Sequence, residues 1–513
     1  MTFNSQGIIQ DVRAQFEYML EFVTGEPART ATADHIERGL FKLLLRLGAK
    51  LLQLFFVMRS QASSRQAIQI ETGQELGYHR DTSREYFSIF GKVSFERPYF
   101  YQKGVGGRTP LDAELSLGED SYSDLLREMS EYLGVYTVYG KTSDILERVL
   151  ELNLSTRALQ QNIAEDAADV EAYYAQKSPP DSAHESEILV IQADGKGVPM
   201  ILDAAPTEPG VRLGKGQKHG HKKEAVVTTV YTIGAAPRTP EEVVASFFEL
   251  PQDPQPPASA HPKPQNKHIW ATLEGKETAL ARLFLQVTRR QGDHIQSKVA
   301  LCDGCEALQS RIAAQFSDFS LVLDFIHASE YLWNVANCLL GETHPDRLDW
   351  MADQTLRILS GQTQQVIADF RQTAQKSKTK ITQREQLNKT ANYFERNLPF
   401  MDYPTYLANG WPIASGVIEG ACRHFVKDRC ELSGMRWNQV GAENLLRLRA
   451  VAENEDWDAY HTFRKQQRHI RLYGSPDSSP EPIEIQVMNT MPTALEPVTP
   501  AGQTSYHYLP LAA

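Results

Sequence analysis

Two aspartates, Asp194 and Asp303, each follow an apolar, β-branched run and are each followed directly by a glycine. A carboxylate beside apolar residues is unfavourable unless it is paired or binds a cation, and ligand sites in α/β sheets lie at the carboxyl ends of strands. On neighbouring strands, the two carboxylates would form a hard-oxygen site suited to Mg²⁺ or Mn²⁺. The alternative is that each aspartate only caps a turn or the following helix.

A third carboxylate stands in the segment SGVIEGACRHFVKDRCELSGMRW, residues 415–437. The Ser-Gly pair predicts a helix start, and helical spacing predicts four side chains that pack inward: Ile418, Cys422, Phe425 and Val426. Glu419, Arg423 and Lys427 then form one stripe of the same helix. This stripe is either a solvated, salt-bridged face or a metal ligand followed by phosphate contacts. Glu431 is the other candidate for the third acid.

The elements that must position these acids follow an α/β pattern. Strand-like and helix-like segments alternate between residues 187 and 340, and a polar helical insertion is expected over 345–400. The first strand, EILVIQAD, is expected to stop at Asp194, where Gly195 lets the chain turn away.

The N-terminal part of the chain has a different pattern. Alternation over 86–101 predicts a short hairpin, and 155–177 reads as a helix capped by Ser155. Residues 1–60 are expected to be helical, with a stripe that packs in a core or against a partner: Leu40, Leu44, Leu47, Leu51, Leu54 and Met58.

The acid-bearing segments resemble those of bacterial insertion-sequence DDE transposases, specifically the ISKra-type group related to Mutator-like transposases. The resemblance rests on ADGKGVPM around Asp194, LCDG around Asp303 and SGVIEGACRHFVKDR around Glu419. DFIH, with Asp324 and His327, resembles the short motif that Mutator-like enzymes carry between the second and third acids, and GMRW at 434–437 also fits. The resemblance covers roughly residues 80–473.

This resemblance implies an α/β fold with an RNase H-like catalytic core, a mixed sheet flanked by helices, and a mainly helical DNA-binding region before it. Asp194, Asp303 and Glu419 would hold two Mg²⁺ ions, which Mn²⁺ can replace, for cleavage and strand transfer at the terminal inverted repeats of an insertion sequence. His327 would either touch the scissile phosphate or bond a buried carboxylate. The implied partners are terminal-repeat DNA, target DNA and a second copy in a homodimer or larger assembly.

The expected organisation has six parts. They are a helical N-terminal region (1–80), a hairpin plus helical DNA-binding region (81–180), the first part of the core (181–340), a helical insertion (341–410), the last core helix with the third acid (411–473) and a disordered tail (474–513).

The net charge by itself argues against DNA binding, because 53 basic and 64 acidic residues give a total of −11. The positive charge is concentrated, however, and the candidate phosphate contacts are Lys215, Lys218, Lys222, Lys223, Arg423, Lys427 and Arg436. We therefore expect DNA contact to be confined to a few basic surfaces and to weaken steeply as salt rises.

The same residues allow three other interpretations. A catalytically inactive, transposase-derived DNA-binding protein is the main alternative, and a glycoside hydrolase with paired carboxylates is less consistent with the basic helix. A zinc site at Cys302 and Cys305 would need two further ligands. Five cysteines indicate a reducing cytoplasm, and the DNA partner implied by the resemblance would place the protein at the nucleoid. The apolar stretch 40–58 is broken by three basic residues, so no membrane span is expected.

Overall fold

The structure is a computed structural model that describes residues 4–70, 72–201, 222–248 and 262–475 of the 513-residue chain. Lys215, Lys218 and the predicted tail after 475 lie outside these ranges. No helix in the described part of the chain is long and apolar enough to cross a membrane.

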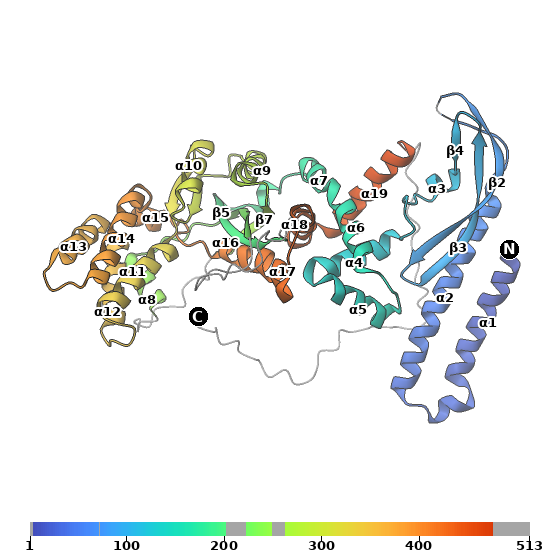
Figure 1. The fold of residues 1–513 in the computed structure, drawn as a ribbon, viewed down its shortest axis with the longest axis horizontal. Helices are drawn as coiled ribbons and strands as arrows, with labels where there is room; N and C mark the ends of the chain where they lie inside the picture. Colours follow the sequence, from blue (N-terminus) through green and yellow to red (C-terminus); the bar gives the residue numbers. More distant parts are fainter. Residues whose placement is uncertain (1–3, 71, 202–221, 249–261, 476–513) are drawn as a thin grey trace, which may run out of the picture.

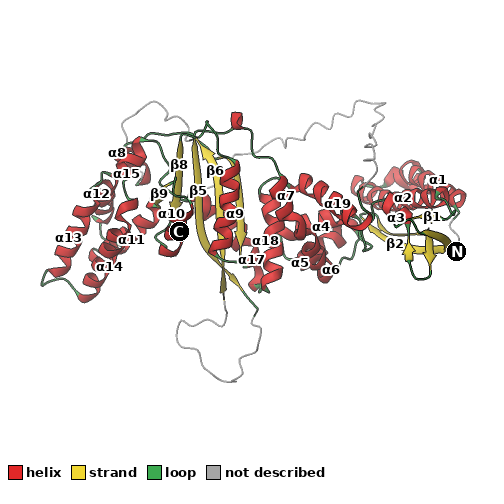
Figure 2. Cartoon of the chain, turned by 90° about the horizontal axis from the view of Figure 1, so that it is seen from above, coloured by secondary structure: helices red, strands yellow, loops and turns green. Residues whose placement is uncertain are grey.

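A five-stranded mixed sheet forms the centre of the molecule (Figure 2), which confirms the α/β expectation. The strand order is β7-β6-β5-β8-β9, in which β5, β6 and β7 are antiparallel and β8 and β9 run parallel to β5. The strands are β5 (Ile188–Pro199), β6 (Lys222–Ile233), β7 (Gln265–Thr272), β8 (Ser297–Cys302) and β9 (Ser320–Leu323).

Both faces of this sheet are buried, which explains the near-continuous apolar runs in its strands. Along β5, Leu189 and Ile191 face α9 (Lys276–Arg289) and α10 (Glu306–Gln315), whereas Ile188 and Val190 join the core around α11 (Phe325–Leu339). The sheet is therefore a rigid support for whatever stands at its edge.

A bundle of helices continues from α11 at one end of the elongated molecule (Figure 1). Its members are α8 (Pro240–Phe247), α12 (Arg347–Leu359), α13 (Thr363–Gln375), α14 (Ile381–Asn397) and α15 (Tyr403–Ala408). Its helices between residues 347 and 408 lie within the expected insertion, and α8 joins them from an earlier part of the chain.

A second helical layer contacts the β6–β7 end of the sheet. It contains α4 (Asp124–Tyr136), α5 (Tyr139–Leu150), α6 (Thr156–Asp166), α7 (Val170–Gln176), α18 (Gln439–Glu453) and α19 (Trp457–Tyr473). As predicted, Ser155 caps α6, since its side chain accepts a hydrogen bond from the backbone N–H of Ala158 at 3.1 Å.

The N-terminal region lies at the opposite end from the α12–α14 bundle (Figure 1). Two helices, α1 (Ser5–Thr24) and α2 (Ala33–Ala62), lie beside a second sheet formed by β1 (Ile68–Gln69), β2 (Glu75–Ser88), β3 (Gly91–Gln102) and β4 (Gly106–Arg108), which α3 (Pro110–Glu114) follows. The predicted hairpin is thus longer than 86–101, and its first strand begins inside the stretch 1–80 that was expected to be helical.

Candidate functional site

Asp194 and Asp303 lie side by side at the edge where the parallel pairing of β5 and β8 ends. The last parallel pair joins Ala193 to Cys302, so the next residue of each strand is one of the two aspartates. Adjacent strands are about 4.8 Å apart. The pKa of the Cys302 thiol is held well above its usual range, first by burial and then by the negative charges of Asp303 and Asp194. Both carboxylates therefore lie near this thiol.

The prediction that the first strand stops at Asp194 is wrong. β5 continues to Pro199, paired throughout with β6, and only its partner β8 ends at this level. Gly195 is not a turn residue, and a Cβ there would meet the carboxylate of Glu224 on β6. The glycine therefore gives room to a side chain across the strand pair rather than freedom to the backbone.

Asp303 does follow a strand end, as expected, and it also caps the turn after it. Its Oδ1 accepts a hydrogen bond from the backbone N–H of Cys305 at 3.0 Å, and its carbonyl accepts one from Nε2 of Gln309 at 3.1 Å. The capping interpretation and the ligand interpretation are compatible here, because capping uses one of the two carboxylate oxygens.

Glu419 reaches the same edge because its helix is fastened to β5. α16 (Gly416–Gly420) docks through the backbone N–H of Ile418, which donates to Oε1 of the buried Gln192 at 2.9 Å. One turn later, Sγ of Cys422 donates to Oδ2 of Asp194 at 3.2 Å. Gln192 and Asp194 are two residues apart and share one face of β5, so these two bonds align the third acid with the first.

The helix after Glu419 is not regular, which the sequence did not predict. Residues Ala421–Lys427 form a π-helix before α17 (Asp428–Cys430) resumes the α-helical pattern. π-helical turns are rare in proteins overall, and those that occur are often found at functional sites. The four predicted inward residues are nevertheless buried, and Arg423 and Lys427 are exposed.

Asp324 connects the elements of this site, a role that the sequence did not reveal. It is fully buried and accepts four hydrogen bonds: from Ile326 N (3.1 Å), from Nδ1 of His327 (2.6 Å), and from the backbone N (3.1 Å) and Oγ (2.5 Å) of Ser415. Ser415 Oγ also lies 3.3 Å from Oε1 of Glu419. Asp324 therefore fixes both the start of α11 and the start of the helix that carries Glu419.

Within the described residues, two groups of three residues place potential ligand atoms within 4.8 Å of one another. One is Asp324, His327 and Glu419, and the other is Glu131, Asp166 and His461 in the helical layer. The predicted triad Asp194, Asp303 and Glu419 is not one of these groups, so the structure brings these acids to one edge without closing them into a single set. Carboxylate oxygens are the donors that Mg²⁺ prefers, and this donor chemistry fits the edge.

The Glu131 group is better explained as an internal charge network. Asp166 accepts hydrogen bonds from Arg127 at 2.6 Å and from Arg464 at 2.9 Å, and all three side chains are buried. The residues come from α4, α6 and α19, so no sequence spacing could have shown that they meet.

The candidate Glu431 is held elsewhere, in an ion pair with Lys222. Lys222 stands opposite Pro199 in the β5–β6 pair. Pro199 is five residues beyond Asp194, which corresponds to about 17 Å along a strand. Glu431 is therefore held away from Asp194, whereas the helix that carries Glu419 is bonded to the strand that carries Asp194.

Two basic candidates, Lys222 and Lys223, bond side chains from beyond the Glu419 helix. Besides the Lys222 ion pair, Nζ of Lys223 donates to Oε1 of Gln439 at 2.6 Å. Arg423, Lys427 and Arg436 have exposed side chains on or just after the Glu419 helix. Arg423 and Lys427, which lie on the Glu419 helix itself, are the better candidates for phosphate contacts.

The helical insertion adds two residues that sequence reasoning missed. The ring of Tyr393 lies where a Cβ on Gly304 would be, and Nη2 of the exposed Arg396 donates to the Gly304 carbonyl at 2.6 Å. Gly304 directly follows Asp303, so α14 supports the turn that carries the second acid. Cys302 and Cys305 are free thiols, and neither belongs to a described ligand group.

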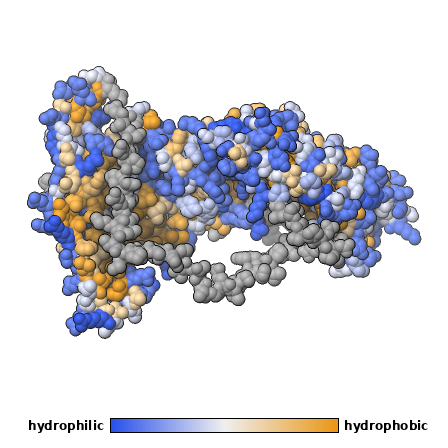
Figure 3. Space-filling view, turned by 180° about the vertical axis from the view of Figure 1, so that it is seen from behind, coloured by the Kyte–Doolittle hydropathy of each residue, from blue (hydrophilic) through white to orange (hydrophobic). Residues whose placement is uncertain are grey.

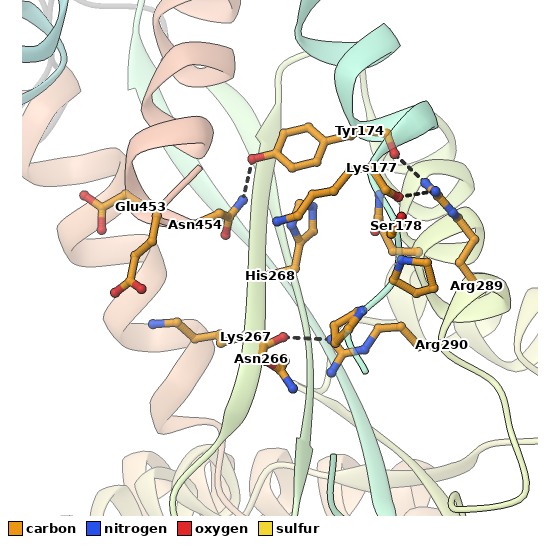
Figure 4. A pocket seen from close by; sticks show the side chains of 14 residues that line it. Tyr174, Lys177, Ser178, Asn266, Lys267, His268, Arg289, Arg290, Glu453 and Asn454 are labelled. Carbon is orange, nitrogen blue, oxygen red and sulfur yellow. Dashed lines mark hydrogen bonds between the residues drawn. The ribbon is translucent and has the colours of Figure 1, made fainter. Parts of the chain in front are cut away.

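A separate cavity of about 400 Å³ opens among α7, β7, α9 and α18 (Figure 4). Arg289 and Arg290 line it, but Arg289 donates to the carbonyls of Tyr174 and Lys177, and Arg290 donates to the carbonyl of Asn266 at 2.9 Å. Burial, together with the charges of Lys177 and Arg290, lowers the pKa of His268 to about 3. Because its arginines already bind backbone carbonyls, this cavity is a structural junction between layers.

His327 is a cation at neutral pH. Its hydrogen bond to Asp324, and then the negative charge of that carboxylate, raise its pKa to about 9 in spite of partial burial. Among the described residues, its Nε2 has no hydrogen-bond partner. The imidazolium therefore bonds a buried carboxylate with one nitrogen and leaves the other for a further acceptor, so the two predicted alternatives do not exclude each other.

The raised pKa of His327 predicts that its protonated ring adds to the free energy of unfolding and that this contribution is lost at high pH. A group whose pKa is about 9 when folded and about 6.5 when unfolded stabilises the fold fully below pH 6.5 and loses this effect as pH rises through 9. We expect the free energy of unfolding of wild type to exceed that of His327→Gln by about 2 kcal/mol at pH 6, after allowing for solvent screening. At pH 10 the difference should be much smaller. Urea unfolding of both proteins across this pH range measures the difference. Unfolding free energies that change with pH in parallel for the two proteins would contradict the prediction.

No family model and no curated protein matches this sequence.

Proposed function

We propose that this chain is a DDE transposase with an RNase H-like core, which cuts DNA at the ends of its own element and joins them to target DNA. The observation that carries the proposal is the convergence of Asp194, Asp303 and the Glu419 helix at one edge of the sheet. The strand order, three antiparallel strands followed by two parallel ones, supports the RNase H-like assignment.

In this proposal Asp194, Asp303 and Glu419 would hold Mg²⁺, or Mn²⁺ in its place. Bound metal supplies activation of the attacking water and stabilisation of the leaving 3′-oxygen. His327 carries a positive charge beside these acids and holds the scissile phosphate through Nε2. Asp324 is a positioning residue, because it orients His327 with one oxygen and anchors Ser415, ahead of Glu419, with both.

The same arrangement accounts for strand transfer. The 3′-hydroxyl freed by cleavage takes the place of water and attacks a phosphate of the target DNA. The bond from that phosphate to the target strand's own 3′-oxygen breaks and this oxygen leaves, so no covalent enzyme intermediate is required. The exposed Arg423 and Lys427 extend from the acid along the helix and contact the neighbouring phosphates.

The test uses the purified full chain and DNA fragments that carry the inverted repeats flanking its reading frame. With Mg²⁺ or Mn²⁺ we expect cuts that leave 3′-hydroxyl ends at the repeat boundary, and no cuts with EDTA. Binding to the repeats without cleavage in either metal would identify an inactive DNA-binding descendant. If the chain neither binds nor cleaves the repeat DNA, the proposal is overturned.

The basic stripe predicts a change in salt dependence. Each phosphate contact contributes about 0.9 to the slope of log affinity against log salt, so Arg423→Ala with Lys427→Ala should lower the slope by about 2. The matched control is Lys376→Ala with Lys378→Ala, two exposed lysines between α13 and α14. Fluorescence anisotropy with repeat DNA measures both slopes, and equal slopes for the two double variants would exclude the stripe as a phosphate contact.

A further inference from the structure

A smaller cavity of about 210 Å³ lies beside the one drawn in Figure 4, and the two share part of their lining. The shared residues are Tyr174, His268, Gln286 and Arg289. The other walls of the smaller cavity come from α7, the β6–β7 strand pair and α9. We call it the aromatic cavity, because three aromatic rings line it.

The three rings form two walls that meet at nearly a right angle. His268 and Trp270 are two residues apart on β7 and share one face of the strand, with ring planes 21° from parallel. The Tyr174 ring of α7 stands across both, at 74° to His268 and 86° to Trp270. Leu283 and Leu285 of α9 complete the apolar lining, and Leu285 is 62% exposed. Such walls offer offset-stacked and edge-to-face contacts to a flat aromatic ligand.

The charged side chains of the lining are already engaged within the chain. Arg282 forms an ion pair with Glu171 and lies over the Trp270 ring, 5.1 Å from its centroid. Glu171 also pairs with Arg447 at 2.8 Å. Arg289 donates to two backbone carbonyls, so an anion would have to compete with them for its guanidinium. The lining therefore favours an uncharged ligand.

Two uncharged side chains of the lining keep hydrogen-bonding groups that the chain does not use. Within the described residues, neither the amide of Gln286 nor the ring nitrogens of His268 have a hydrogen-bond partner. His268 is a neutral imidazole, since burial and the charges of Lys177 and Arg290 lower its pKa to about 3. A neutral imidazole and an amide each offer both a donor and an acceptor.

We propose that the aromatic cavity binds an uncharged purine-type ring, a flat bicycle with donors and acceptors along its edge. A glutamine amide matches the neighbouring N6 donor and N7 acceptor of adenine, and His268 can bond a further ring nitrogen. A cavity of about 150 Å³ holds benzene, so 210 Å³ leaves room for a second ring. The inference does not depend on the proposed catalytic activity.

The test is titration calorimetry of the full chain with adenine. We expect one molecule per chain, with a dissociation constant of about 1 mM or tighter. Gln286→Leu keeps a side chain of similar size without the amide and should weaken binding at least about tenfold. The matched control is Gln365→Leu, which changes an exposed glutamine of α13 in the bundle at one end of the molecule (Figure 1) and should bind as wild type does.

Indole separates hydrogen bonding from apolar burial, because it is a bicycle of nearly the same size with one donor and no ring-nitrogen acceptor. It should bind more weakly than adenine and should be insensitive to Gln286→Leu. Ala175→Phe places a ring in the cavity from an exposed position of α7 and should block both ligands. Circular dichroism confirms that each variant is folded.

Three outcomes would overturn the proposal: no saturable binding of adenine, an equal loss of affinity in both glutamine variants, or indole bound as tightly as adenine. Oligodeoxyadenylate added to the adenine complex distinguishes two sources of the ring. Displacement of adenine would show that a nucleic acid strand can supply it, and retention of adenine would identify a free base or nucleoside as the ligand.

Discussion

Asp303→Asn should abolish metal-dependent DNA cleavage, with a loss of at least about a thousandfold, while the protein stays folded. Asparagine has the shape of aspartate but no negative charge, so it removes a proposed metal ligand from the edge where Asp194 and Asp303 meet. Its side-chain oxygen can still accept the hydrogen bond from Cys305 N, which preserves the turn. Rates of nicking on repeat DNA, with the melting temperature measured alongside, separate the two effects.

The two candidates for the third acid provide the matched control. Glu419→Gln should lose activity to the same extent as Asp303→Asn, because its helix is aligned with Asp194 through Cys422. Glu431→Gln should keep nearly full activity, since it loses only an ion pair with the exposed Lys222. The reverse order of these two variants would show that the third acid is misassigned, and an active Asp303→Asn variant would refute the catalytic proposal itself.

Asp324→Ala should be among the most destabilising single substitutions in the core, with a loss of about 3–5 kcal/mol in the free energy of unfolding. The change leaves four donors without an acceptor: the N–H groups of Ile326 and Ser415, the Ser415 hydroxyl and the ring of His327. It also disconnects α11 from the helix that carries Glu419. Urea unfolding of the full chain measures the loss.

Ser155→Ala is the reference for this prediction, because Ser155 caps α6 at the surface and its loss should amount to only about 1 kcal/mol. If Asp324→Ala destabilises no more than Ser155→Ala, Asp324 is an ordinary helix cap. In Asp324→Asn, the pKa of His327 should fall from about 9 toward its ordinary value, because the charge that raises it is gone. An NMR titration of His327 therefore tests the positioning role separately from stability.

Local pattern was enough to predict much of the sheet and its acids. Apolar runs buried on both sides marked the strands, and a carboxylate next to such a run is conspicuous because its burial is unfavourable unless a partner or cation compensates. The inward residues of the Glu419 helix were also predictable, since helical periodicity depends only on neighbours in the chain. These features are local, so the sequence contains them directly.

What the sequence could not show depends on contacts between distant segments. The continuation of β5 past Asp194 follows from its pairing with β6, and the connecting role of Asp324 follows from Ser415, which lies 91 residues further along the chain. Arg396, which supports the turn after Asp303, is equally distant from it in the sequence.

The stripe on α2 shows the same division between sequence and structure. Its leucine spacing was plain from the sequence and was equally consistent with a core or with a partner. Tertiary structure determined which residues of this helix are buried, because β3 and α1 pack against two of its sides. Leu44, Leu51 and Met58 face away from both and stay exposed. Figure 3 shows hydrophobic residues gathered along this N-terminal end of the molecule. The sequence thus determined which residues are apolar, acidic or basic and at what period they recur. Only the packing of distant elements determined which of them meet, because burial is a property of the assembled layers and not of the local chain.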